Sequence, residues 1–471
     1  MMWVPCITFL LLTLSTICFG DNPGATIQIT DYGLKGGVQY LVNTLMPNNT
    51  EYQLPNVTGT ENIGNEDMKY EFTRIRLVKF NLGNLSSQWL PGTGMRVSMK
   101  NGNATINCNW KIDSWLINDS GTGVMTLTGL SISMIMGVSR IDPGVPSVHL
   151  LDCQSSVQNV DVQMLGGVSY IYESIKESIQ DVVRRAVDQQ LCSSIRNEAK
   201  KWDQWLSNLK MKLPVNRLME LDLSLVGNLE VSDCYANIGL KGFFQSLIKS
   251  HGETAFSPAP MTLPVQHDAM FYVGVSQSFL DSLGSACYSA GFLTFEVSHL
   301  VGSKDLTTSE LATYMPEISQ HFPNPAPVKI KMYATKSPMV FLQSNNLTIQ
   351  FSGTLQTYVY PSKNQTENLF SVNLVVNLQT DISLSQAKGA PGLNLTGSVI
   401  LDRLQIEGSE TVIKVEKGVV TENGVQQLFQ EIVVPNVNEQ LASGIYIPIK
   451  FVTKTSVHVK QGFAMLAADL K

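Results

Sequence analysis

The stretch LDCQSSVQNVDVQMLGGVSYIYESIKESIQDVVRRAVDQQLC, Leu151–Cys192, decides the fold. Apolar residues in its second part recur three or four positions apart, at Val168, Tyr172, Ile175, Ile179, Val182, Val183 and Ala186. Charged residues such as Glu173, Lys176 and Arg184 occupy the other side of this repeat. This spacing predicts a long amphipathic helix with one buried face.

The sequence around this helix alternates between apolar and polar residues, which predicts strands with one buried face. Arg96–Lys100 and Ile106–Ile112 alternate cleanly, and Leu130–Met136 continues the pattern. Similar runs recur in the second half, at Val328–Tyr333, Leu347–Tyr358 and Leu369–Leu384. Long antiparallel strands are the natural interpretation.

Three further segments have helical periodicity. An early stripe comprises Leu34, Val38, Leu41, Val42 and Leu45; a late one comprises Val425, Leu428, Phe429, Ile432 and Val433 and is expected to end before Pro435. A weaker helix includes Val275, Phe279, Leu283 and Ala286. Helices and strands therefore recur in a similar order in both halves, which indicates an approximate internal duplication.

The amino-terminal 20 residues, Met1–Gly20, form an apolar run that ends in small residues and precedes a polar segment. This pattern predicts a signal peptide and secretion; a retained membrane anchor is the alternative. Hydrophobic residues make up 44% of the chain and charged residues 15%, so large apolar cores are expected. The formal net charge of −6 gives no indication of a nucleic-acid partner, and no later segment predicts an integral membrane protein.

Eight Asn-x-Ser/Thr sequons predict a glycoprotein of the secretory pathway. They begin at Asn48, Asn56, Asn84, Asn103, Asn118, Asn346, Asn364 and Asn394.

Several segments resemble the bactericidal permeability-increasing protein and lipopolysaccharide-binding protein family, to which plasma lipid-transfer proteins are related. Leu151–Cys192 resembles its cysteine-strand-helix-cysteine segment. ITDYGLKGGVQYLVNTL, Ile29–Leu45, matches the family's first helix, and GVQQLFQEIVVPNVNEQLASGIYIPI, Gly424–Ile449, resembles its last. Phe322-Pro323 and Ser337-Pro338 lie in stretches similar to its second domain. The resemblance covers essentially the whole chain after the leader.

The resemblance implies an α+β fold of two similar domains. Each is a highly twisted antiparallel β-barrel with long amphipathic helices, and a central β-sheet joins the two into a boomerang. We expect a signal peptide over 1–20, an amino-terminal lipid-binding domain over 21–224, a linker over 225–233 and a carboxy-terminal lipid-binding domain over 234–471. One apolar pocket per domain would hold a phospholipid.

Five of the seven cysteines follow the leader. The resemblance implies a disulfide between Cys153 and Cys192, which would fasten the long helix to the strand that begins near Cys153. Cys108 shares a strand face with Ile106 and Trp110, so a buried free thiol is expected. Cys234 and Cys287 are a candidate second disulfide, with an intermolecular bond as the alternative.

The helix stripes supply candidate residues for the two apolar pockets, although ordinary core packing explains each stripe equally well. In the first domain we expect the early helix to face the long one across a slot for acyl chains. In the second domain we expect residues of the weaker helix and of the late helix to line the pocket. The candidates are Leu34, Val38, Leu41, Val42, Leu45, Ile171, Ile175, Ile179, Val182 and Val183, then Phe279, Leu283, Leu428, Phe429 and Ile432.

No catalytic or metal-binding motif is recognisable. The chain has no G-x-S-x-G elbow, no H-E-x-x-H and no P-loop, and Gly92–Gly94 and Gly121–Gly123 are expected in turns between strands. We therefore predict neither catalytic residues, nor a metal, nor a cofactor, and a non-enzymatic protein.

The chain departs from the family at the tip of the first domain, where bactericidal members cluster Lys and Arg against lipopolysaccharide phosphates. Pro47–Tyr70 contains Lys69 alone among several acids, and Asn107–Thr122 contains Lys111 alone. Phosphate recognition needs clustered cations. Arg74, Arg76 and Lys79 are interpreted as a solvated face, and Trp89, Trp110 and Trp115 as candidate contacts with lipid surfaces.

We predict a secreted lipid-binding protein of innate immunity, with phospholipid and lipopolysaccharide or the bacterial outer membrane as partners and antibacterial activity implied by the family. The alternatives are a phospholipid or neutral-lipid carrier without antibacterial activity, an inert structural or storage glycoprotein and, least favoured, a secreted hydrolase.

Overall fold

The computed structural model describes residues 22–45, 52–63, 66–115, 118–166, 169–248, 257–302, 304–362, 365–387, 392–411, 421–447 and 452–470. The predicted leader lies outside these residues. The chain forms two compact units. We call Ile29–Leu209 with Asn228–Asn237 the amino-terminal unit, and residues 22–28, Lys210–Gly227 and Ile238–Lys471 the carboxy-terminal unit.

These units do not follow the contiguous ranges expected from the sequence. Residues 22–28 belong to the carboxy-terminal unit, whereas Asn228–Asn237 belong to the amino-terminal unit. Strands β1 (Ala25–Thr30) and β13 (Tyr235–Leu240) each cross a unit boundary. Alternation along a strand shows that one face is buried, but it does not show which sheet the strand joins.

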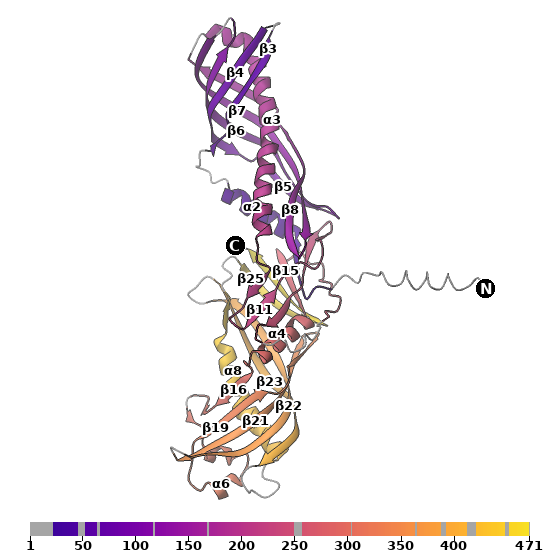
Figure 1. Cartoon of the computed structure of the whole chain (residues 1–471), viewed down its shortest axis with the longest axis vertical. Helices are drawn as coiled ribbons and strands as arrows, with labels where there is room; N and C mark the ends of the chain where they lie inside the picture. Colours follow the sequence, from indigo (N-terminus) through magenta and orange to yellow (C-terminus); the bar gives the residue numbers. More distant parts are fainter. Residues whose placement is uncertain are drawn as a thin grey trace, which may run out of the picture. The chain divides into compact units, whose positions relative to one another are not determined.

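An eight-stranded antiparallel sheet dominates the amino-terminal unit (Figure 1). Its order is β2-β4-β6-β7-β8, with β3 beside β4, β5 beside β6 and β9 beside β7. The strands are β2 (Tyr52–Gln53), β3 (Val57–Ile63), β4 (Glu66–Asn81), β5 (Asn84–Leu90), β6 (Gly94–Asp113), β7 (Asn118–Ile141), β8 (Val145–Ser156) and β9 (Asn159–Leu165). The two-residue strand β12 (Glu230–Val231) lies outside this sheet and pairs with β13.

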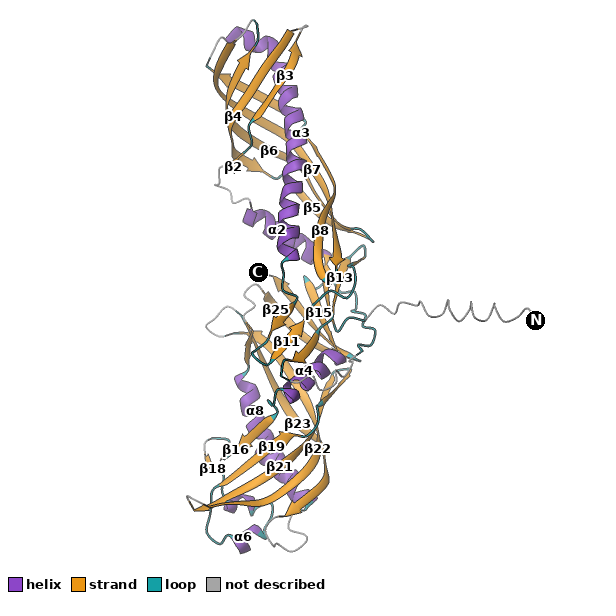
Figure 2. Cartoon of the chain, viewed as in Figure 1, coloured by secondary structure: helices purple, strands orange, loops and turns teal. Residues whose placement is uncertain are grey.

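Two helices pack on this sheet. α2 (Asp31–Leu45) contacts β5, and α3 (Ser169–Ser207) runs along β8 and also contacts β9 and β3 (Figure 2). The apolar stripe of the sequence accounts for the first part of α3, and the helix continues well beyond it. The predicted long helix is thus confirmed.

Inward-facing residues of the sheet and one face of α3 form the main core of this unit. Side chains along β6 alternate between buried and exposed, as the sequence pattern predicts. Trp110 is buried and its indole nitrogen donates a 2.9 Å hydrogen bond to the Thr122 carbonyl oxygen. Gly121–Gly123 lies inside β7 and not in the predicted turn. Gly121 is required there by the close approach of β9, because a Cβ at this position would overlap the Leu165 carbonyl oxygen.

The carboxy-terminal unit contains a second large antiparallel sheet in the order β16-β19-β21-β22-β23-β24, with β20 beside β21. Two small sheets have the orders β10-β11-β14 and β17-β18, and a six-stranded sheet has the order β12-β13-β1-β15-β26-β25. The strands are β10 (Lys212–Pro214), β11 (Met219–Asp222), β14 (Phe243–Ser246), β15 (Phe271–Ser276), β16 (Thr294–Val297), β17 (His299–Leu300), β18 (Lys304–Asp305), β19 (Val328–Ala334), β20 (Met339–Gln343), β21 (Asn346–Ser362), β22 (Gln365–Gln386), β23 (Leu393–Thr411), β24 (Ile445–Ile447), β25 (Val452–Lys460) and β26 (Phe463–Leu470).

The helices of this unit include the weaker predicted helix, α4 (Gln277–Ser289), whose first turn is capped by the Ser276 hydroxyl accepting from the Phe279 amide. Two short helices were not predicted: α5 (Thr308–Leu311) and α6 (Ile318–His321).

The sequence predicts that the late helix ends before Pro435, but in the structure the helix continues past this residue. It continues as α7 (Glu422–Leu428), a π-helical turn η2 (Phe429–Val433) and α8 (Val434–Ser443). The Val434 amide donates to the Phe429 carbonyl oxygen, five residues back. This wider turn carries the helix into Pro435, which lies in the first turn of α8, where a residue without an amide hydrogen is tolerated.

The α+β class is confirmed, but the predicted closed barrels are not found. Among the described residues, each large sheet is an open path that ends in strands paired on one side. No helix in the described part of the chain is both long and apolar enough to cross a membrane.

Candidate functional site

The amino-terminal unit contains an apolar cavity between its sheet and α3. The cavity includes about 890 Å³ of space that protein atoms do not fill, counting its open mouth. Its lining comprises Leu54, Pro55, Val57, Phe72, Ile75, Leu77, Phe80, Ala104, Ile106, Met125, Leu127, Leu130, Val182, Val183, Ala186, Val187, Gln190, Leu191 and Ser194.

Two periodicities produce this lining. On β4, β6 and β7, alternate residues point to the same side of the sheet, which places Ala104 and Ile106 next to Leu127 and Met125 of the adjacent strand. On α3, the lining residues run from Val182 to Ser194 at intervals of three and four, so they form one stripe. The sheet face and the helix stripe are both apolar, and the space between them remains unfilled.

A second, polar cavity adjoins the apolar one. We call it the polar annex; it includes about 950 Å³ of unfilled space, open solvent included. Val57, Val182, Ala186 and Gln190 line both cavities, so the two are neighbours. The remaining residues of the annex are Asn56, Thr58, Glu61, Tyr70, Arg185 and Gln189.

The long helix contributes part of the lining expected from it. Val182 and Val183 line the apolar cavity, and Ile179 is buried in the adjoining core. The side chains of Ile171 and Ile175 lie outside the described part of the chain.

The early helix does not face α3 across the cavity. Leu34 and Val38 pack in a separate cluster with Trp89 and Val97, and Leu41 is 44% exposed. Val42 is half-buried, and the Leu45 side chain is not described. Leu34 and Val38 of α2 are therefore ordinary core, a role that their spacing left open.

Sequence reasoning missed the residues of the strands that form most of the cavity wall. Phe72, Ile75, Ala104, Met125 and Leu127 are among them. The alternation of apolar and polar residues along β4, β6 and β7 indicated that one face of these strands is buried. It did not show that α3 lies far enough from this face to leave a cavity.

The candidate residues of the second domain belong to two different clusters. Leu428, Phe429 and Ile432 are at most 1% exposed and pack inside the main core of the carboxy-terminal unit. Phe279 and Leu283 contact Phe244 and Met219 in another cluster. The Phe279 and Phe244 rings meet edge to face, with centroids 5.1 Å apart. The structure does not bring the five residues together.

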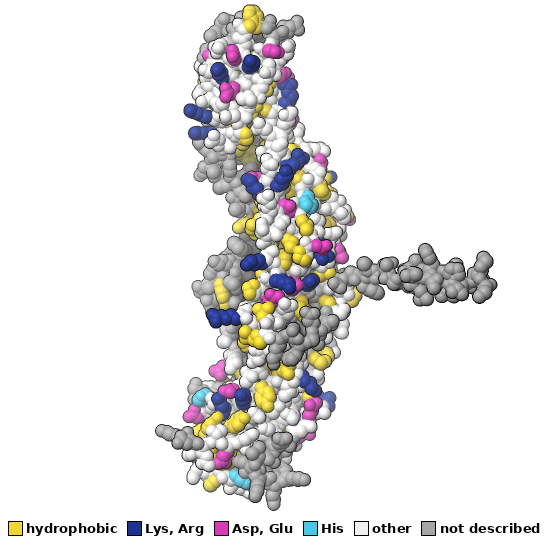
Figure 3. Space-filling view, viewed as in Figure 1, with side chains coloured by type: hydrophobic (Ala, Val, Ile, Leu, Met, Phe, Trp, Pro, Cys, Tyr) yellow, Lys and Arg dark blue, Asp and Glu magenta, His cyan; other side chains and the backbone are white. Residues whose placement is uncertain are grey.

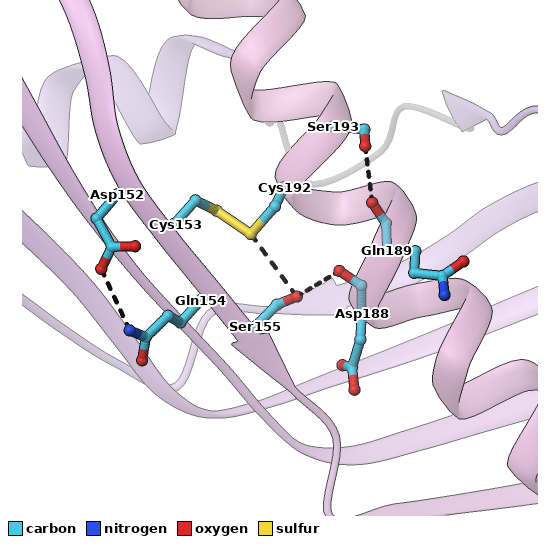
Figure 4. The surroundings of a disulfide bond; sticks show 8 residues. All are labelled: Asp152, Cys153, Gln154, Ser155, Asp188, Gln189, Cys192 and Ser193. Atoms are coloured by element: carbon cyan, nitrogen blue, oxygen red, sulfur yellow. Dashed lines mark hydrogen bonds between the residues drawn. A yellow bond between two sulfur atoms is a disulfide. The ribbon is translucent and has the colours of Figure 1, made fainter.

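The expected disulfide joins Cys153 of β8 to Cys192 of α3 (Figure 4). Next to it, the Ser155 hydroxyl donates a 2.9 Å hydrogen bond to the Asp188 carbonyl oxygen of α3. The candidate pair Cys234 and Cys287 is not bonded: Cys234 belongs to the amino-terminal unit, whereas Cys287 lies on α4 of the other unit. Cys108 is a buried free thiol, as expected, and burial raises its pKa to about 11.

Comparison with known proteins gives this site a family context. Residues 33–209 match the model of the LBP / BPI / CETP family, N-terminal domain, and residues 214–471 match that of its C-terminal domain. The chain belongs to the LBP / BPI / CETP family.

Relatives in the LBP / BPI / CETP family match along almost the whole chain. The human BPI fold-containing family C protein is 26% identical over 466 residues, which cover 95% of this chain and 89% of the relative. The bactericidal permeability-increasing protein of Sebastes schlegelii is 24% identical, covering 100% of this chain and 98% of the relative. A crystal structure of lipopolysaccharide binding protein, 19% identical, superposes with a TM-score of 0.58 over 96% of this chain and 99% of that one. At that identity the last match concerns the fold alone.

The amino-terminal tip of this family member is poor in clustered positive charge. Lys69 lies opposite Asp113, and Lys111 lies opposite Glu71, on β4 and β6. On the visible face of Figure 3, Lys and Arg side chains occur singly or in small groups, many with acidic side chains nearby. Arg74, Arg76 and Lys79 are exposed, as the interpretation of a solvated face requires.

Of the three tryptophans considered as lipid contacts, Trp115 has the exposure required, with 73% of its surface accessible. Trp89 and Trp110 are buried, so that interpretation is wrong for them. Both lie on strand faces that turn toward the core, where a large apolar ring gains most from burial.

One cluster of this family member combines Ser, His and Asp side chains. The Ser147 hydroxyl donates a 2.5 Å hydrogen bond to Asp203 of α3, and His149 Nε2 lies 3.2 Å from the same hydroxyl. In a hydrolase triad the carboxylate orients the imidazole, whereas here it accepts directly from a fully buried serine. The cluster therefore fastens α3 to β8. Among the described residues no group of three or more His, Cys, Asp or Glu side chains is placed to hold a metal ion.

Four of the sequon asparagines are exposed: Asn56, Asn84, Asn103 and Asn118. Asn346 and Asn394 are half-buried, and Asn48 and Asn364 lie outside the described residues.

Proposed function

We propose that this protein is a secreted, non-enzymatic lipid-binding glycoprotein that holds acyl chains in the apolar cavity of its amino-terminal unit. One observation carries the proposal: an open cavity between α3 and the sheet is lined almost entirely by apolar side chains. Polar lining residues, Gln190 and Ser194, are few, as expected for a site that binds by burial.

Burial alone gives enough free energy for such binding. Each methylene group transferred from water contributes about 0.8 kcal/mol, so a dozen contribute roughly 10 kcal/mol before the cost of immobilising the chain. No charged contact within the apolar cavity is needed.

The test is native mass spectrometry of the full secreted chain, followed by solvent extraction of what it carries. We expect a bound acyl lipid. Replacement of Ala104 by Phe projects a ring into the cavity and should abolish or strongly reduce the bound lipid. The matched control, Ala236→Phe in the separate cluster around Leu34 and Val38, should leave the lipid in any chain that remains folded. A wild-type chain without lipid, or lipid unaffected by Ala104→Phe, would contradict the proposal.

We further propose a role in innate immunity, since relatives are named lipopolysaccharide-binding and bactericidal permeability-increasing proteins. Saturable binding of lipopolysaccharide or bacterial outer membranes at physiological salt would support it, because screening removes weak charge contacts. Loss of all binding at that salt would contradict it.

A second candidate function is lipid carriage without antibacterial activity. The observation that favours it is the opposition of Lys69 and Lys111 to carboxylates at the tip, which weakens attraction to clustered phosphates. Transfer of labelled phospholipid between vesicles in the absence of any bacterial killing would favour this function, and killing without transfer would exclude it.

A further inference from the structure

The polar annex adjoins the apolar cavity, and its chemistry differs sharply from that of the cavity. Asn56, Gln189 and Gln190 provide amide groups, and Thr58 and Tyr70 provide hydroxyls. Four residues line both spaces, so a lipid whose acyl chains fill the apolar cavity has a polar surface within reach of its head group.

The charges of the annex are balanced. Its lining contains one cation, Arg185, and one anion, Glu61, and their side chains form a 2.7 Å ion pair between α3 and β3. Both remain accessible, with 54% and 30% of their side chains exposed. A head group that enters the annex therefore meets one guanidinium and one carboxylate at the same time.

Such a lining discriminates by net charge. A phosphate that approaches Arg185 also approaches Glu61, so an anionic head group gains one attraction and suffers one repulsion. A zwitterion can place its anion on Arg185 and its cation on Glu61, and a sugar can hydrogen-bond to the amides and hydroxyls without charge. Neither the zwitterion nor the sugar therefore brings a charge close to a residue of the same sign.

We propose that the polar annex is the head-group site of this protein and that the Glu61–Arg185 pair selects lipids whose head groups carry no net charge. This inference rests on the proposed function, since it requires acyl chains in the apolar cavity. Glu61 and Arg185 act as specificity-determining residues, and the apolar cavity supplies most of the affinity.

The test loads the full secreted chain from vesicles that contain equal amounts of phosphatidylcholine, phosphatidylglycerol and a glycosyl diacylglycerol with matched acyl chains. Bound lipids are then extracted and quantified. We expect the two neutral lipids to exceed phosphatidylglycerol. Glu61→Gln leaves Arg185 uncompensated and should raise the phosphatidylglycerol share by up to about fivefold, the upper end for one exposed charge pair. Arg185→Gln should lower that share, and the exchange Glu61→Arg with Arg185→Glu should restore the wild-type ratio.

The control lies on the same helix. Asp181 and Arg184 form an exposed ion pair, also 2.7 Å, and neither residue lines the annex. Asp181→Asn changes the net charge by the same amount as Glu61→Gln and should leave the lipid ratio unchanged. Equal ratios for Glu61→Gln and Asp181→Asn, or a wild type that prefers phosphatidylglycerol, would overturn the head-group inference. A chain that takes up none of the three lipids would instead overturn the proposed function.

Discussion

Ala104 of β6 and Ala199 of α3 are equally buried, each with 4% of its surface exposed, but they face different surroundings. Ala104 lines the apolar cavity, whereas Ala199 packs against Met136 and Val148. The same small side chain thus borders free space on the strand and filled core on the helix.

This difference predicts opposite results for the same enlargement. Ala104→Leu should be tolerated or stabilising by up to about 1 kcal/mol in lipid-free protein, because the cavity accommodates the added carbons. Ala199→Leu should cost about 1–3 kcal/mol through overpacking. Urea unfolding of both variants measures the two free energies. Equal losses of stability would show that the cavity is closed in solution.

The Cys153–Cys192 disulfide fastens α3 beside the cavity, since Leu191 is a lining residue. The bonded cysteines are 39 positions apart, and the loop-entropy model gives about 4 kcal/mol for a loop of this size. We expect Cys153→Ala with Cys192→Ala to lower the free energy of unfolding by about 2–4 kcal/mol and to speed lipid release. Calorimetry and the rate of lipid transfer measure the two effects.

Cys234→Ser is the control for that experiment, because Cys234 is unbonded in the same unit. It should leave stability within about 0.5 kcal/mol of wild type, as for a surface substitution. Lipid release unchanged by loss of the disulfide would mean that the contacts of α3 with β8 hold the helix without it.

Asp203 fastens the carboxy-terminal part of α3 to β8, and this contact predicts a pH dependence. The hydrogen bond from Ser147 holds the pKa of Asp203 below its usual value of 3.8; burial acts in the opposite direction, and the Val148 amide and His149 add smaller lowering effects. A carboxyl with a lowered pKa in the folded state stabilises the protein above its unfolded pKa, and that contribution is lost as the pH falls through the folded value.

We therefore expect Asp203→Asn to reduce stability at pH 7 and to have progressively less effect below about pH 4. Thermal unfolding of wild type and variant across this range measures the difference, and Asp181→Asn on the same helix is the exposed control. A deficit that stays constant down to pH 2 would show that the carboxylate's charge does not matter.

Asn56 is both a sequon asparagine and a residue of the polar annex. A glycan on it would extend from the annex and hinder access to the proposed head-group site. We expect Asn56→Gln to speed lipid exchange severalfold in secreted protein, whereas Asn103→Gln, at an exposed position of β6 outside the annex, should not. Glycopeptide mapping establishes which asparagines are occupied. With Asn56 occupied, equal exchange rates for the two variants would rule out this effect.

The sequence predicted local structure well wherever one periodicity ran without interruption. The helix that contains Ile179 and Val182 and the strand that contains Ile106 and Trp110 were recognisable, because a buried face needs apolar residues at a fixed spacing. The late helix was cut short at Pro435, since a wider turn formed by Phe429–Val433 is not visible in the pattern.

The candidate site was predicted less completely. Val182 and Val183 were placed correctly on the cavity wall, but Leu34 and Val38 have the same kind of spacing and pack elsewhere. The annex was missed because Glu61 and Arg185 are 124 positions apart and each resembles an ordinary surface charge.

The sequence by itself determined the α+β class, the long helix, the alternating strands and, through resemblance, the family and the Cys153–Cys192 pair. Only the tertiary structure decided which buried faces enclose free space and which charges meet beside that space. The physical reason is that periodicity records burial along one segment, whereas a cavity depends on the separation between two segments, and neither segment encodes that separation alone.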